Sequence, residues 1–236
     1  FIFFLFAYFI IKPNFMVYYD EFGFLDAAQY FARFSKLGVT LIGSKATPFL
    51  LDYYNWPPVP AVLMAIFMKI FGTSMNVAFV FILIIAGLNL LIFSRTIYLF
   101  TKDKSLELLS LLVLGVTPIF LKNATALSNE IVMIFFALLA FNFYLQYKEK
   151  SNLLLFILFV INTFLFLQCR FELAILVVPI VFTIFRILKQ ENFNWKYVLV
   201  FLFFIGGLIV YIKYPLYFAS KHTEFGISII NFSNHI

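Results

Sequence analysis

Long apolar runs without charged side chains constrain the fold of this chain more than any other feature. Residues 76–94 and 152–169 carry no Asp, Glu, Lys or Arg. A helix that crosses the hydrocarbon core of a bilayer needs about 20 predominantly apolar residues. Lipid offers no hydrogen bonds to an exposed backbone, so such runs must satisfy their own backbone groups as helices. The sequence therefore predicts an all-α fold, a bundle of helices that crosses the membrane several times.

Composition excludes a soluble domain. Hydrophobic residues make up 64% of the 236 residues, charged residues 12%, and the mean hydropathy is +1.02. Soluble domains are about 45–50% apolar and about 25% charged. The net charge of +6 could suggest nucleic-acid binding. We instead expect no nucleic-acid partner, because basic cytoplasmic loops are usual in membrane proteins. The single cysteine, Cys169, excludes an intrachain disulfide and a cysteine-based metal site.

Apolar runs and the polar segments between them give the expected order of elements. The first run is about half the length of a span, so we interpret residues 1–236 as one transmembrane domain, the N-terminal portion of a longer protein. Its first outer loop covers about 12–75. The expected elements are a helix that ends near 11, a short apolar stretch 57–72, and the runs 76–100, 106–121, 130–147, 152–169, 172–188 and 196–215.

Within the first outer loop, residues 24–37 have the pattern of an amphipathic helix. The apolar face is expected to carry Phe24, Ala27, Ala28, Phe31 and Phe34. A helix of this kind lies in the membrane interface rather than across the bilayer.

The distribution of Lys and Arg predicts the orientation. The stretch 57–72 reaches about 24 Å as a helix, short of a core of about 30 Å. If it does not cross, most basic loops fall on the cytoplasmic side, as the positive-inside rule requires. We therefore expect seven crossings and one short surface helix, in the plasma or inner membrane of a cell or in the endoplasmic reticulum.

Two adjacent carboxylates, Asp20 and Glu21, follow the first helix on the expected outer side. Such a pair suits proton abstraction, because one carboxylate can stay ionised while its neighbour is tuned. The same pattern also fits an acidic, solvated loop. No cofactor is required by the sequence, although adjacent carboxylates leave a divalent metal possible.

Further candidate residues fall on the same expected face. Glu130 stands at the start of an apolar run, where it could bind substrate or simply favour the helix N-terminus next to a cap at Ser128 or Asn129. Arg170 and Glu172 lie between two apolar runs, either as a phosphate contact or as a simple turn with a snorkelling arginine. Lys45 could reach a lipid phosphate or remain solvated.

Four motifs in order resemble a known family over roughly residues 15–190. They read YYDEFGFLDAAQYFARFSKLG, NWPPVPAVLMAIFMKIFG, TPIFLKNATALSNEIVMIFFALLAFNFYL and CRFELAILVVPIVF. This series resembles the GT-C glycosyltransferases, in particular the dolichyl-phosphate-mannose protein mannosyltransferase type, which includes the bacterial aminoarabinose transferase. The resemblance implies a GT-C bundle with amphipathic juxtamembrane helices in the first outer loop.

The resemblance also implies a reaction. Asp20 would be the general base on the acceptor hydroxyl, with Glu21 beside it, and the sugar would arrive on a polyprenyl phosphate and be transferred with inversion. Glu130 would position the acceptor or the sugar. Acceptors in such a family are lipids, glycans or proteins. The chain departs from the family pattern at Trp56, where some relatives carry Lys or His, and at Asn129, where an Asp is frequent.

Two other classes of function remain open at this point. A transporter or lipid flippase would line a translocation path with the same charges, but such proteins often show inverted repeats and helices broken near mid-membrane. Neither feature is seen in the sequence. A non-catalytic assembly subunit would tolerate loss of Asp20.

Overall fold

The computed structural model describes residues 19–35, 39–41, 49–51 and 58–209. The side chains of residues 19–22 and of Phe171 fall outside this description, as do those of the two strands. Contacts divide the chain into two compact units, Phe1–Thr183 (unit 1) and Ile184–Ile236 (unit 2), which we treat separately. The predicted first helix and the polar tail lie outside the described residues.

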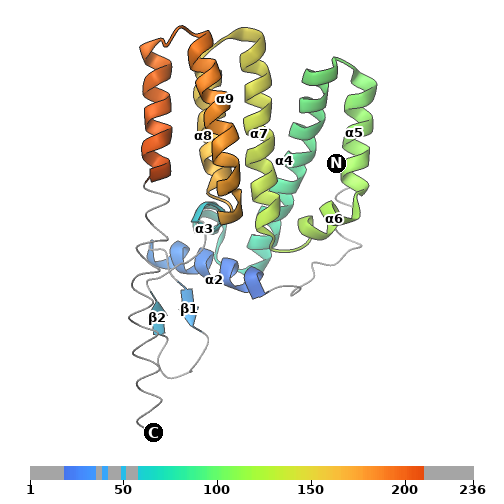
Figure 1. The fold of residues 1–236 in the computed structure, drawn as a ribbon. Coiled ribbons are helices and arrows are strands. Elements are labelled where there is room, and N and C mark those ends of the chain that lie inside the picture. The colour runs from blue at the N-terminus through green and yellow to red at the C-terminus, as the bar shows by residue number, and fades with distance from the viewer. Residues whose placement is uncertain (1–18, 36–38, 42–48, 52–57, 210–236) are drawn as a thin grey trace. The chain divides into compact units, whose positions relative to one another are not determined.

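Helices make up nearly all of the described chain (Figure 1). In order they are α2 (Tyr19–Phe34), α3 (Pro58–Phe71), α4 (Met75–Thr101), α5 (Lys104–Val116), α6 (Pro118–Ala124), α7 (Asn129–Lys150), α8 (Leu153–Leu167), the 3₁₀ helix η1 (Phe171–Leu176), α9 (Val177–Gln190) and a final helix, Trp195–Ile209. The expected all-α membrane bundle is confirmed. The sequence did not predict the one short antiparallel ribbon, β1 (Val39–Leu41) with β2 (Phe49–Leu51), in which Thr40 lies opposite Leu50.

Small polar residues mark where the apolar helices begin. Ser74 caps α4, Asp103 caps α5, Ser128 caps α7 and Asn152 caps α8, each accepting a hydrogen bond from a backbone N–H of the first turn. Such caps satisfy backbone donors that have no partner inside the helix. The starts of the apolar runs at 76, 106, 130 and 152 therefore coincide closely with the starts of these four helices.

Two described helices, α4 with 27 residues and α7 with 22, are long and apolar enough to span a membrane alone. A third candidate span is the pair α5 and α6, which meet at a bend of 66°. The shorter helices α3, α8 and Trp195–Ile209 are also apolar. The chain is thus a membrane protein with two or three candidate spans among the described residues, and the seven predicted crossings stay a prediction.

Two predicted runs are interrupted in the structure. The run 106–121 was expected to be one helix, but it breaks at Thr117 because Pro118 has no backbone N–H to donate and disfavours helical geometry in the residue before it. The run 172–188 begins with the 3₁₀ helix η1 before α9 starts at Val177.

The amphipathic helix α2 begins five residues earlier than predicted, so Asp20 and Glu21 belong to its first turn. Its apolar face packs against α3, with Phe24, Ala27 and Ala28 completely buried. Phe34, at the end of the helix, is 54% exposed and is not part of the buried portion of this face.

Polar contacts hold the ends of α2 and α3 together. Gln29 Nε2 donates to the carbonyl oxygen of Thr73 at 3.0 Å, just beyond the end of α3. Lys69 Nζ on α3 donates to Ser35 Oγ at 2.7 Å and lies 5.6 Å from the centre of the Phe31 ring. These contacts fix α2 and α3 relative to each other.

Helix α7 packs between α4 and α8 in unit 1 (Figure 1). It runs parallel to α4 and antiparallel to α8. The contacts that define these directions are Asn89 with Ile131, Thr96 with Asn142 and Lys102 with Glu149 for α4, and Tyr147 with Phe156 and Tyr144 with Phe159 for α8. With 22 residues, α7 is about 33 Å long. Glu130 and Lys148 therefore lie near opposite ends of the same helix.

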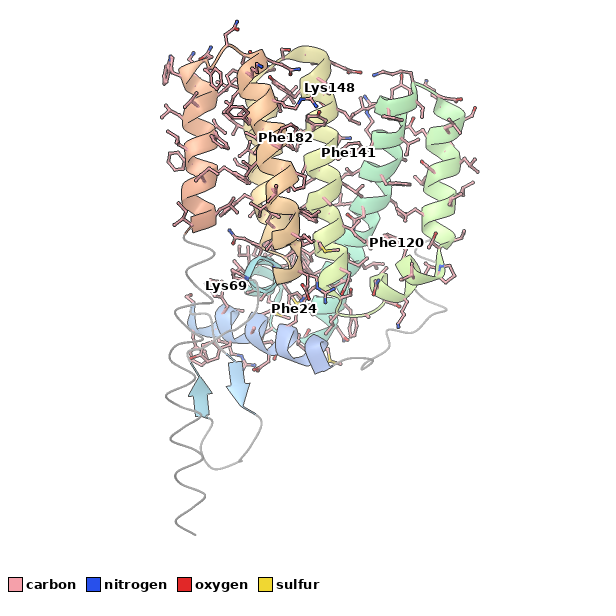
Figure 2. All side chains as sticks on the ribbon, viewed as in Figure 1. Phe24, Lys69, Phe120, Phe141, Lys148 and Phe182 are labelled. Carbon is pink, nitrogen blue, oxygen red and sulfur yellow. The ribbon has the colours of Figure 1, made fainter. Side chains whose placement is uncertain are left out.

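A single buried apolar cluster joins the elements at the Glu130 end of α7. It contains side chains from α2, α3, the first half of α4, α6 and the first two turns of α7, together with Cys169. Phe24 and Phe120 lie at this end of unit 1, whereas Lys148 lies at the other (Figure 2). Burial of this apolar surface links α2 and α3 to the start of α7.

Unit 2 contains the second half of α9, a turn and the helix Trp195–Ile209. The turn is closed by a hydrogen bond from the backbone N–H of Phe193 to the carbonyl oxygen of Leu188 at 2.8 Å. Asn192 and Phe193 adopt positive φ angles of 50° and 52°, which lets the chain reverse within a few residues.

Candidate functional site

An ion pair between Glu130 and Arg170 forms the centre of the candidate site. Glu130 lies in the first turn of α7, and Arg170 lies in the connection that follows α8. Because α7 and α8 are antiparallel, the start of one meets the end of the other. Arg170 Nη1 donates to Glu130 Oε1 at 2.8 Å. Two residues that the sequence placed separately on one face are thus in direct contact.

Ser128 fixes the second oxygen of the same carboxylate. Its hydroxyl caps α7 by accepting from the backbone N–H of Glu130 at 3.2 Å, and it donates to Glu130 Oε2. The helix N-terminus adds a favourable field for a negative charge. Both oxygens of Glu130 therefore have their own donor, and the carboxylate is held in one orientation at the start of α7.

Glu172 lies beside this pair at a longer distance. Its Oε2 is 3.8 Å from Arg170 Nε, beyond hydrogen-bond range, and its side chain is 77% exposed. A guanidinium carries five N–H donors. Among the described residues, only Nη1 of Arg170 has a hydrogen-bonding partner, and the side chain is 38% exposed. The arginine can therefore donate further hydrogen bonds to a ligand.

The remaining predicted residues are not placed with the same detail. Asp20 and Glu21 lie in the first turn of α2, and their side chains are outside the described set. Lys45 lies outside the described residues. The buried cluster nevertheless contains Phe24, one turn after Asp20, together with Ile131 and Cys169, which directly follow Glu130 and precede Arg170. The first turn of α2 and the ion pair therefore border one apolar core.

In the part of the chain whose side chains are described, no group of three or more His, Cys, Asp or Glu side chains gathers. Burial raises the pKa of Cys169 to about 12, so its thiol stays protonated at neutral pH. A protonated, buried thiol is neither a good nucleophile nor a good metal ligand. The charged groups of the candidate site are thus two carboxylates and one guanidinium.

An apolar groove of about 380 Å³ lies along the middle of α7, between α8, η1 and the first half of α9. Its walls include Ala137, Phe141 and Tyr144 on α7, Phe159 and Phe166 on α8, and Pro179 and Thr183 on α9. Figure 2 shows Phe141 in the middle of α7. Ala137 follows Glu130 by seven residues, so the two share a helix face about 10 Å apart along the axis. The groove and the ion pair therefore lie on the same side of α7.

Sequence reasoning missed the groove, the second contact of Ser128 and the role of Asn89 on α4. The amide Nδ2 of Asn89 donates to the carbonyl oxygen of Ile131 at 2.8 Å. One signal was present, because an Asn within an apolar run is expected to face protein rather than lipid. The groove left no signal in the sequence, since its walls are ordinary apolar residues of three separate helices.

The fold and these side chains define a helical membrane protein with a charged site at one end of its bundle. Comparison with protein families identifies it further: the model of the family described as dolichyl-phosphate-mannose-protein mannosyltransferase matches residues 55–218. The chain belongs to this family, and it is a membrane glycosyltransferase of the GT-C type. Comparisons with curated proteins and with solved structures gave no match. The matched region contains Glu130, Arg170 and Glu172 but neither Asp20 nor Lys45.

The ion pair is expected to contribute little to stability. Glu130 and Arg170 are 33% and 38% exposed, and exposed pairs typically contribute about 0.2–1 kcal/mol. We expect Glu130→Gln and Arg170→Gln each to lower the free energy of unfolding by about 1 kcal/mol or less, measured by denaturant unfolding in detergent. The double variant should lose about as much as either single one, because both remove the same interaction. Losses of several kcal/mol in the free energy of unfolding, or single-variant losses that simply add in the double variant, would contradict the view that this ion pair serves function more than stability.

Proposed function

We propose that the protein transfers a sugar from a polyprenyl-phosphate donor to an acceptor hydroxyl at the membrane face where α2 and the start of α7 lie. The observation that carries this proposal is the Glu130–Arg170 pair on the same side of α7 as an apolar groove, whose wall begins at Ala137, about 10 Å further along the helix. A lipid phosphate has the same two parts, an anionic head and an apolar chain. Family membership supplies the reaction class.

Arg170 is the proposed contact for the donor phosphate. A guanidinium binds phosphate through two parallel N–H groups, which a lysine cannot do. The isoprenoid chain would follow α7 from Arg170 into the groove lined by Ala137 and Phe141. Lys45 and Glu172 are proposed as further contacts to the substrates at the outer end.

Asp20 is the proposed general base, with Glu21 beside it. The acceptor oxygen attacks the anomeric carbon of the sugar while its proton passes to the Asp20 carboxylate. The bond between the anomeric carbon and the phosphate oxygen breaks, and polyprenyl phosphate leaves with that electron pair. A single displacement of this kind inverts the anomeric centre. Glu130, fixed by Ser128 and Arg170, would accept hydrogen bonds from hydroxyl groups of the sugar or acceptor.

The distribution of charge supports an outer location for this chemistry. Lys102, Lys104, Lys148 and Lys150 lie at the end of unit 1 opposite Glu130. Basic residues of short loops favour the cytoplasmic side. The site would then face the periplasm or lumen of a multi-pass protein, where its acceptor would be a lipid, a glycan or a protein.

The proposed base gives the first test. Asp20→Asn removes the proton acceptor with almost no change in shape, so we expect sugar transfer to be lost while expression and thermal unfolding stay unchanged. The measurement is transfer of labelled sugar by the purified full-length protein. Asp26→Asn is the matched control, because it removes another carboxylate from α2 and should keep activity. An active Asp20→Asn protein would exclude this residue as the base.

The groove gives a second test. Ala137→Phe adds a ring to its wall, so the KM for a long-chain donor should rise about tenfold or more while the KM for a short-chain analogue stays the same. Leu138→Phe, on the next position of α7 and not part of the wall, is the control. Equal effects on long and short donors would show that the chain does not occupy this groove. A protein that moves the lipid donor without transferring its sugar would instead support a flippase.

A further inference from the structure

Asn89 is a polar side chain buried completely in the middle of α4. Its exposed fraction is 0%, and its neighbours in the apolar cluster include Ile85, Ala86 and Leu90. We propose that Asn89 is a positioning residue: its hydrogen bond to the first turn of α7 sets the position of Glu130 relative to Arg170. The functional part of this inference rests on the proposed glycosyl transfer.

The hydrogen bond of Asn89 is not needed to satisfy the backbone of α7. The carbonyl oxygen of Ile131 lies inside a helix, where it accepts from the N–H four residues later. The 2.8 Å bond from Asn89 Nδ2 is therefore an additional, directional contact between α4 and α7.

The amide oxygen of Asn89 is evidence against a role of this residue in stability. Its Oδ1 is buried and has no hydrogen-bonding partner among the described residues. A buried polar atom without a partner disfavours the folded state. An apolar side chain at this position would avoid that cost. The amide therefore serves to position the first turn of α7 rather than to stabilise the fold.

The position of the first turn of α7 matters because Ile131, which accepts the hydrogen bond of Asn89, directly follows Glu130. The side chains that the first turns of α7 place in the buried cluster with α4, Ile131, Val132 and Phe136, are apolar, and apolar contacts have no fixed direction. The second polar contact of this helix pair, Asn142 with Thr96 at 3.0 Å, lies eleven residues further along α7, about 16 Å away. Asn89 is therefore the polar contact that can fix the axial position of the Glu130 turn.

The test compares Asn89→Leu with Asn142→Leu in the full-length protein. Both variants remove a buried amide from the α4–α7 contact, but only the first lies beside Glu130. We expect Asn89→Leu to keep or raise the thermal midpoint and to increase amide hydrogen exchange several-fold in residues 129–136. Asn142→Leu should leave exchange in that segment unchanged. Equal exchange in the wild type and Asn89→Leu, or equal increases in both variants, would overturn the inference whether or not the proposed reaction is correct.

A kinetic comparison separates the positioning role from the proposed function. We expect Asn89→Leu to lower kcat/KM about tenfold or more, since small misplacements near a reacting centre have large effects. In a Glu130→Gln background the same change should have little further effect, because Asn89 acts through Glu130. Additive losses in the two backgrounds would overturn the positioning role. If Glu130→Gln itself leaves transfer unchanged, the assigned role of Glu130 is wrong, and the exchange measurement still decides the structural claim.

Discussion

The packing of α7 between α4 and α8 is the contact on which the rest of this structure depends. Its direction, parallel to α4 and antiparallel to α8, brings the start of α7 to the end of α8 and so brings Glu130 to Arg170. The same packing leaves the groove beside Ala137 and Phe141. Apolar contacts supply most of the surface in this packing, and a few buried amides give it a direction. The candidate site is thus a consequence of how three helices align.

Polar groups within the apolar helices are few, and their places are informative. An amide or charge in such a segment is costly unless it meets a partner, so it usually faces protein or water rather than lipid. Asn89 and Asn142 meet partners across the α4–α7 contact, whereas Glu130 and Arg170 lie half-exposed at the end of the helices. The buried amides orient the helices, and the half-exposed charges can reach a substrate.

Much of the fold could be predicted, because apolar runs and their polar ends follow simple rules. The starts of α4, α7 and α8 agree with the sequence to within a few residues. The bend after α5 was missed although Pro118 was visible, and the exposure of Phe34 at the end of α2 was not predicted. The order of the predicted spans was enough to place Glu130 and Arg170 on the same face of the membrane. Their direct contact, the groove and the Asn89 bond depend on how helices distant in sequence pack, which periodicity alone does not give.

The most direct measurement is the fate of a labelled donor given to the purified full-length protein in lipid vesicles. Polyprenyl-phosphate sugar and nucleotide sugar are offered separately with a mixture of cell-envelope acceptors. We expect that label leaves the polyprenyl-phosphate donor, appears on an acceptor with inverted anomeric configuration, and is matched by released polyprenyl phosphate. Transfer from the nucleotide sugar alone, or a lipid donor that stays intact, would contradict it.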